Sequence, residues 1–165
     1  MSPKSLVVTP LEAPSNNAAL APAKSQTHLP QRILVVDDDT AIRQLNSEVL
    51  IGSGYRVDTA EDGDAGWKVL HAVRYDPDSY DLLITDNNRP KVSGVELIEK
   101  LRSARMTVPV IMLSGASPTN TDRLQLAAIL PKPFSPDQLV QTVKEVLHWS
   151  TAGANRKSPL EGRRV

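Results

Sequence analysis

The 165-residue sequence has no cysteine, which excludes disulfide bonds, thiolate metal sites and a cysteine nucleophile. It has no net charge either, because 19 Lys and Arg residues balance 19 Asp and Glu residues, so no global field draws it to nucleic acid or to an anionic membrane. No apolar run approaches the roughly 18 residues that a membrane helix needs. We therefore expect a cytoplasmic protein whose partners include neither nucleic acid nor membrane.

The two ends of the chain differ in composition from its middle. Residues 1–30 are rich in Pro, Ser, Ala and Asn with little periodicity, which predicts a disordered leader. Residues 31–149 predict one domain of ordinary size. Residues 150–165 are polar with two basic pairs and predict a flexible basic tail, whose four cations are too few to indicate nucleic-acid binding.

Five short runs organise the middle of the chain; four are apolar, and the second alternates weakly and predicts a strand near the sheet edge. They lie at residues 33–36, 55–60, 82–86, 108–113 and 128–130. Segments of helical periodicity separate them, except that residues 121–128 predict a short helix at best, and a last helix is expected to end near Trp149. The alternation predicts an α/β protein, a doubly wound (βα)5 parallel sheet. The flavodoxin-like strand order 2-1-3-4-5 would place the first and third strands side by side.

Acidic residues stand where the first and third runs end. Asp37 and Asp38 follow the first run, and Asp86 ends the third. Because the carboxyl ends of parallel strands meet at one edge of a sheet, the three carboxylates are predicted to share a pocket. Their repulsion, roughly 1 to 4 kcal/mol per pair, favours a bound divalent cation. All-oxygen ligands at an open strand end favour Mg²⁺ over a closed Ca²⁺ cage or zinc.

The fourth and fifth runs also end in polar residues, Ser114 and Lys132. A hydroxyl and an ammonium beside a carboxylate–metal site suit the oxygens of a phosphoryl group. We predict that Asp86 is the nucleophile and forms an aspartyl phosphate. Each feature alone has an ordinary structural explanation. Asp37–Asp39 could cap a helix, Asp86 could be a turn residue, and Lys132 could be a solvated surface residue. The joint placement at four strand ends is the specific signal.

The stretch from about Arg32 to Trp149 resembles the receiver domain of two-component response regulators, a CheY-like fold. The matching motifs are Ile33 to Asp39, Leu83-Ile84-Thr85-Asp86 with Pro90 and Gly94, Ile111-Met112-Leu113-Ser114-Gly115, and Pro131-Lys132-Pro133-Phe134. The resemblance implies a phosphoprotein of phosphorelay signal transduction, in which Asp86 accepts a phosphoryl group from the phosphohistidine of a sensor histidine kinase or phosphotransfer protein.

The resemblance also implies roles for the other site residues. They are direct Mg²⁺ ligation by Asp38 and Asp86, ligation by the backbone carbonyl of Asn88, contact of Asp37 through water, and contacts of Ser114 and Lys132 with the phosphoryl oxygens. Because no output domain follows in the sequence, we expect a stand-alone receiver that signals through a protein partner. It would be a self-phosphorylating and autodephosphorylating domain and not a turnover enzyme.

Three local departures from the family pattern bear on the switch. Arg89 stands where a hydrophobic residue, often Met, usually precedes the proline; a cation there would hold the phosphate, alter partner choice or fill the metal space. Ile129 replaces the Tyr or Phe that switches together with the hydroxyl of Ser114. The interval from Ser114 to Lys132 is short by roughly one helical turn, so the fourth helix is expected to be abbreviated.

Two other functions remain open at this point. One is a phosphorylation-independent interaction module, a pseudo-receiver, supported by Arg89, Ile129 and the short fourth helix. The other is a Mg²⁺-dependent phosphatase that uses Asp37 and Asp39, whose spacing resembles the nucleophile and acid pair of haloacid-dehalogenase-type enzymes. The second leaves Asp86 without a role.

Overall fold

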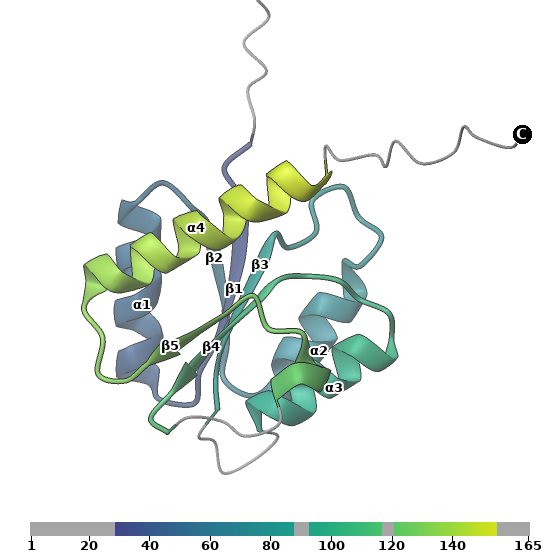
Figure 1. Cartoon of the computed structure of the whole chain (residues 1–165), viewed down its shortest axis with the longest axis horizontal. Helices are drawn as coiled ribbons and strands as arrows, with labels where there is room; N and C mark the ends of the chain where they lie inside the picture. Colours follow the sequence, from purple (N-terminus) through teal and green to yellow (C-terminus); the bar gives the residue numbers. More distant parts are fainter. Residues whose placement is uncertain (1–28, 88–92, 117–120, 155–165) are drawn as a thin grey trace, which may run out of the picture.

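Five parallel strands form the centre of the protein, in the order β2-β1-β3-β4-β5. The computed structural model describes residues 29–87, 93–116 and 121–154. The strands are β1 Arg32–Val36, β2 Arg56–Ala60, β3 Leu82–Asp86, β4 Val110–Ser114 and β5 Ala128–Pro131. The predicted doubly wound parallel sheet and its strand order are confirmed (Figure 1). The first and third strands are neighbours, which places their carboxyl ends side by side.

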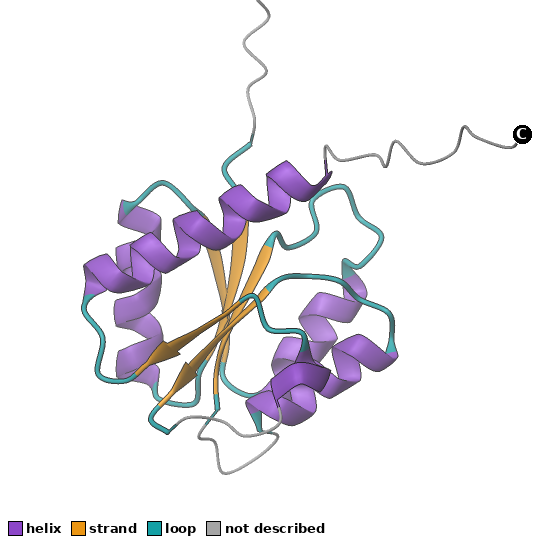
Figure 2. Cartoon of the chain, viewed as in Figure 1, coloured by secondary structure: helices purple, strands orange, loops and turns teal. Residues whose placement is uncertain are grey.

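Helices cover both faces of this sheet (Figure 2). They are α1 Thr40–Gly52, α2 Gly63–Ala72, α3 Gly94–Ser103, the 3-10 helix η1 Thr121–Leu124, and α4 Pro136–Ala154. Side chains alternate along each strand, so Ile33 packs with α1 and α4 on one face whereas Leu34 packs with α2 and α3 on the other. Within the described residues, no helix has the length and apolar content to cross a bilayer.

The last helix is longer than the sequence indicated. The expected end near Trp149 is wrong, because α4 continues to Ala154 and takes in the first residues of the expected tail. The hydroxyls of Ser150 and Thr151 donate to the carbonyls of Val146 and Leu147 at 3.1 and 3.2 Å, which satisfies these polar side chains within the helix. The rest of that tail, and all but the last two residues of the expected leader, lie outside the described residues.

The amino-terminal edge of the sheet carries a network of paired charges, here called the amino-edge network: Arg32, Arg56, Asp58, Asp78 and Tyr80. Asp58 accepts hydrogen bonds from Arg32 Nε at 2.8 Å and from Tyr80 Oη at 2.7 Å. The carboxylate of Asp78 accepts hydrogen bonds from both terminal nitrogens of Arg56, at 2.6 and 2.9 Å. The Arg32 guanidinium also lies 4.5 Å from the centroid of the Tyr80 ring. The network ties β1, β2 and the segment before β3 together.

The short connection between β4 and β5 is anchored by one side chain. Arg102, near the end of α3, donates to the backbone carbonyls of Met106, Val108, Leu124 and Gln125 at 2.8, 3.1, 3.0 and 3.1 Å. Burial lowers the pKa of this guanidinium. Two of these bonds, to Leu124 at the end of the four-residue η1 and to Gln125, hold the end of the connection against α3.

Candidate functional site

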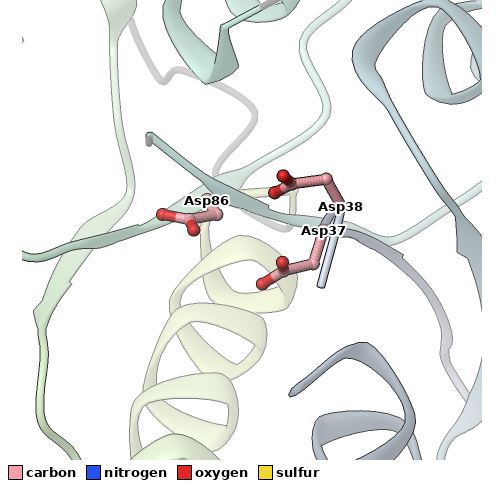
Figure 3. A group of neighbouring side chains, drawn as sticks. All are labelled: Asp37, Asp38 and Asp86. Atoms are coloured by element: carbon pink, nitrogen blue, oxygen red, sulfur yellow. The ribbon is translucent and has the colours of Figure 1, made fainter. Parts of the chain in front are cut away.

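Three carboxylates meet at the carboxyl-terminal edge of the sheet, as the strand order predicts. Asp37 and Asp38 follow β1, and Asp86 is the last residue of β3. The pairing of Val36 with Thr85 brings the two strand ends level. Each of the three residues offers a carboxylate oxygen, and these oxygens all lie within 4.8 Å of one another (Figure 3). We call Asp37, Asp38 and Asp86 the acidic cluster.

Asp37 is the most deeply buried acid of the acidic cluster. Its side chain is 1 % exposed, and its Oδ1 accepts a hydrogen bond from the backbone N–H of Asp39 at 3.0 Å. Its Oδ2 is buried without any hydrogen-bond partner. Burial raises the pKa of Asp37, and the charges of Asp86 and Asp38 raise it further, against the Asp39 N–H and Lys132. The ionised form is therefore costly here unless a cation compensates it.

Asp86 and Lys132 form a direct ion pair. Asp86 is 4 % exposed, and the Lys132 Nζ donates to its Oδ2 at 2.8 Å. The backbone places Lys132, because its N–H donates to the carbonyl of Ser114 at 2.8 Å and so continues the pairing of β5 with β4. The peptide between Lys132 and Pro133 is cis. Lys132, which follows β5, thus reaches across the end of β4 to Asp86 at the end of β3.

Ser114 and Ile129, the two predicted switch residues, lie on adjacent strands. Ser114 is buried at the end of β4, and its hydroxyl donates to the carbonyl of Ala116 while accepting from the Ala116 N–H at 3.3 Å. Ile129 pairs with Met112 in the sheet register and is 40 % exposed on β5, the edge strand. The hydroxyl is therefore held by the residue at the start of its own loop. The neighbour of Ser114 on β5 is Pro131, two residues beyond Ile129.

Three of the residues singled out in the sequence are not part of the acidic cluster as the structure describes it. Asp39 is the N-cap of α1, where its Oδ1 accepts from the N–H groups of Ala41 and Ile42 at 2.9 and 3.1 Å. This placement removes the support for the Asp37 and Asp39 pair of a phosphatase. Asn88 and Arg89 lie outside the described residues.

Sequence reasoning missed one residue that contacts the site loop. Arg43 extends from α1, and its Nη1 donates to the backbone carbonyl of Asp37 at 2.6 Å. Its Nη2 donates to the hydroxyl of Thr40 at 3.3 Å. No periodicity marks such a contact, because an arginine one turn after a helix cap reads as an ordinary surface residue.

The donor set of the acidic cluster fits a hard divalent cation. Three carboxylate oxygens converge from two strand ends, and one of the buried oxygens, Oδ2 of Asp37, has no hydrogen bond to satisfy it. Among the described residues, the ammonium of Lys132 forms an ion pair with one of the three acids, Asp86. Oxygen ligands of this kind suit Mg²⁺, which binds through one or two carboxylates and keeps several waters. The individual ligand roles stay predictions.

Comparison with known proteins agrees with this geometry. Residues 33–144 match the family model described as the response regulator receiver domain. Among curated proteins, the transcriptional regulatory protein CpxR of Klebsiella pneumoniae is 39% identical over 127 residues, which are 72% of this chain and 51% of CpxR. The chain thus spans about half the length of the curated relatives it matches.

Solved structures show the same fold. A CheY-like receiver domain protein from Methanospirillum hungatei has a TM-score of 0.66 at 29% identity, covering 75% of this chain and 98% of the other. The response regulator protein TrrA from Thermotoga maritima, solved in complex with Mg²⁺ and BeF, has a TM-score of 0.61 at 34% identity, covering 70% of this chain and 98% of the other. Both likenesses extend over nearly the whole of the related chain.

Proposed function

The chain belongs to the response regulator receiver domain family of two-component systems, and from this premise we propose that Asp86 accepts a phosphoryl group in a Mg²⁺-dependent reaction. The donor is the phosphohistidine of a sensor histidine kinase or of a phosphotransfer protein in a phosphorelay. The observation that carries the proposal is the convergence of Asp37, Asp38 and Asp86 within 4.8 Å beside Lys132.

Each residue of the site has a distinct task in this reaction. A carboxylate oxygen of Asp86 forms a bond to phosphorus as the bond from phosphorus to the histidine nitrogen breaks, and the imidazole leaves with the electron pair. Mg²⁺, when bound, neutralises the acids and the developing phosphoryl charge. As the family resemblance implies, Asp38 and Asp86 would hold the cation directly, and Asp37 would hold it through water. Lys132 stays beside Asp86 and supplies positive charge to the phosphoryl oxygens.

The response to phosphorylation starts at Ser114. Its hydroxyl is bonded to Ala116 in the unphosphorylated chain, and a phosphoryl oxygen on Asp86 competes for the same hydroxyl. The loop after β4 then changes its preferred arrangement, which is a population shift that a protein partner reads. Ile129 has no aromatic ring to turn, so we expect the change to begin at the contact between Ser114 and Ala116.

The test is incubation with Mg²⁺ and acetyl phosphate, read as intact mass. The unmodified chain is expected to gain one phosphoryl group that is acid-stable and base-labile, and Asp86→Asn is expected to gain none. Asp64→Asn is the matched control, because Asp64 lies outside the acidic cluster and pairs with Lys100 at 3.2 Å. EDTA should abolish the adduct in every variant.

Other outcomes would point to the competing functions. The lack of an adduct on the unmodified chain, with acetyl phosphate or phosphoramidate, would contradict the proposal and favour a phosphorylation-independent interaction module. Hydrolysis of a small phosphoester by Asp86→Asn would favour the phosphatase. An adduct that persists in Asp86→Asn would move the phosphoacceptor to another residue.

A further inference from the structure

We propose that Arg43 of α1 is a positioning residue for the metal site, which holds the peptide between Asp37 and Asp38 so that Asp38 presents its carboxylate to the cation. The inference rests on the proposed function in one respect, namely that the acidic cluster binds Mg²⁺. Arg43 would act through the backbone and would not touch the cation or the phosphoryl group.

The guanidinium of Arg43 is anchored on both sides of the loop that it holds. Nη1 donates to the carbonyl of Asp37 at 2.6 Å, and Nη2 donates to the hydroxyl of Thr40 at 3.3 Å. The backbone of Arg43 is itself fixed, because its N–H donates to the carbonyl of Asp39 at 2.8 Å and its carbonyl accepts the hydroxyl of Ser47 at 2.7 Å. The contact therefore transmits the rigidity of the helix to the end of β1.

Asp38 needs such support more than the other two acids do. Asp37 and Asp86 are buried, whereas Asp38 is exposed. Within the described part of the chain, no hydrogen bond or ion pair holds the Asp38 carboxylate. Only the backbone can aim it at the cluster. A metal ligand whose orientation is left free loses affinity, because binding must then order it.

The peptides on both sides of Asp38 are held, and Arg43 holds the first. A trans peptide is planar, so fixing the carbonyl of Asp37 fixes the plane that leads into Asp38. The peptide after Asp38 is held from the other direction, because its N–H, on Asp39, donates to Oδ1 of Asp37 at 3.0 Å. Without Arg43 the first of these two restraints is lost and the second remains.

The action of Arg43 on the site is mechanical. Arg43 reaches a backbone carbonyl and a hydroxyl, with two nitrogens held in one plane. A lysine at this position keeps the charge but has a single ammonium, which cannot span both acceptors in the same fixed geometry. The arrangement thus predicts that Arg43→Lys restores function only in part.

The experiment compares Mg²⁺ affinity, by calorimetric titration, in Arg43→Met, Arg43→Lys and Gln44→Met. Outer-shell partners of metal ligands typically account for about 10- to 100-fold in affinity, and we expect a loss in that range for Arg43→Met. Arg43→Lys should fall between that variant and the unmodified chain. Gln44→Met is the matched control on the next position of α1, where the amide bonds to Glu48 at 2.9 Å, and its affinity should stay within about twofold of the unmodified chain.

A second measurement separates positioning from a merely structural role. The initial rate of phosphorylation of Arg43→Met by acetyl phosphate should approach that of the unmodified chain as Mg²⁺ is raised, because the defect lies in holding the cation. Unchanged Mg²⁺ affinity in folded Arg43→Met would overturn the inference. If that variant fails to fold, unchanged affinity in Arg43→Lys would overturn it as well. Lack of Mg²⁺ binding by the unmodified chain would instead overturn the proposed function on which the inference rests.

Discussion

The two edges of the sheet treat aspartate in opposite ways. At the amino-terminal edge, Asp58 and Asp78 receive hydrogen bonds from two arginines and a tyrosine. At the carboxyl-terminal edge, Lys132 pairs with Asp86 of the acidic cluster, and Oδ2 of Asp37 is buried without a hydrogen-bond partner among the residues that the structure describes. Aspartate thus stabilises the fold at the amino-terminal edge and destabilises it at the carboxyl-terminal edge. An uncompensated charge that the fold tolerates marks the place where a ligand is needed.

The pKa values of these aspartates express the same contrast. Burial pushes the pKa of Asp58 upward, but the hydrogen bonds from Tyr80 and Arg32 outweigh it and the pKa lies below its ordinary value. Hydrogen bonds from Arg56 lower the pKa of Asp78. The pKa of Asp37 is raised, with burial as the largest cause. Ionisation therefore favours the fold at one edge and opposes it at the other.

The largest expected effect comes from breaking the amino-edge network at its centre. Arg32→Met removes the hydrogen bonds to Asp58 and Asp78 and the contact with Tyr80. Because Asp58 is half exposed and solvent screens the pair, we expect a loss of about 1 to 2 kcal/mol in the free energy of unfolding. Urea denaturation measures it. Lys100→Met, which breaks an exposed pair, should change stability by less than about 0.5 kcal/mol. Equal losses of stability in Arg32→Met and Lys100→Met would show that the amino-edge network contributes no more than an exposed ion pair.

A pair of matched substitutions, one at each edge, should change stability in opposite directions. Asp58→Asn loses a charge that the fold uses, and we expect it to destabilise the protein by about 1 kcal/mol at neutral pH. Asp37→Asn relieves repulsion within the acidic cluster, and we expect a stabilisation of about 1 kcal/mol in EDTA. Denaturation in EDTA and in Mg²⁺ checks both. Destabilisation by Asp37→Asn in EDTA would show that the site carries no stored electrostatic cost.

The smallest expected effect is the pH dependence of the stability changes caused by Asp37→Asn and Asp58→Asn. Because the pKa of Asp37 is raised in the fold, its charge opposes folding above that pKa, and the cost fades as the pH falls through it toward the unfolded value of about 3.9. The advantage of Asp37→Asn should therefore shrink as the pH is lowered from 7 toward 4. The pKa of Asp58 is lowered, so its contribution should persist over this range and be lost only below about pH 4. Urea denaturation midpoints in EDTA, measured from pH 7 to pH 4, test these two trends. If the stability changes caused by Asp37→Asn and Asp58→Asn varied with pH in the same way, the prediction would be contradicted.

The sequence predicted the parts of the fold that have a pattern. The apolar run that ends in Asp86 became β3, buried along its whole length, and the acids at two strand ends came together because parallel strands share an edge. The placement of Ser114 and Lys132 followed from the same rule. The apolar runs and the polar residues that end them are enough to state these features, because a strand buried on both faces stays apolar until it reaches the edge of the sheet.

The contacts of two arginines, and one helix end, could not be predicted. Arg43 and Arg102 both reach backbone carbonyls, which every residue has, so no partner residue signals the contact in the sequence. The end of α4 was placed too early because Ser150 and Thr151 read as tail residues, although their hydroxyls bond within the helix. Such contacts depend on the distance between elements, which only the assembled fold determines.

The anchoring of the β4–β5 connection by Arg102 makes that connection a natural place for protein engineering. Arg102 binds two carbonyls in the distal part of the connection, those of Leu124 and Gln125, as well as the carbonyls of Met106 and Val108 before β4, so new residues inserted just after Ala116 would lengthen only the proximal part. The sheet register and the anchored part would keep their geometry. A recognition peptide grafted there would sit next to Ser114, where its exposure would report on the phosphorylation state of the domain.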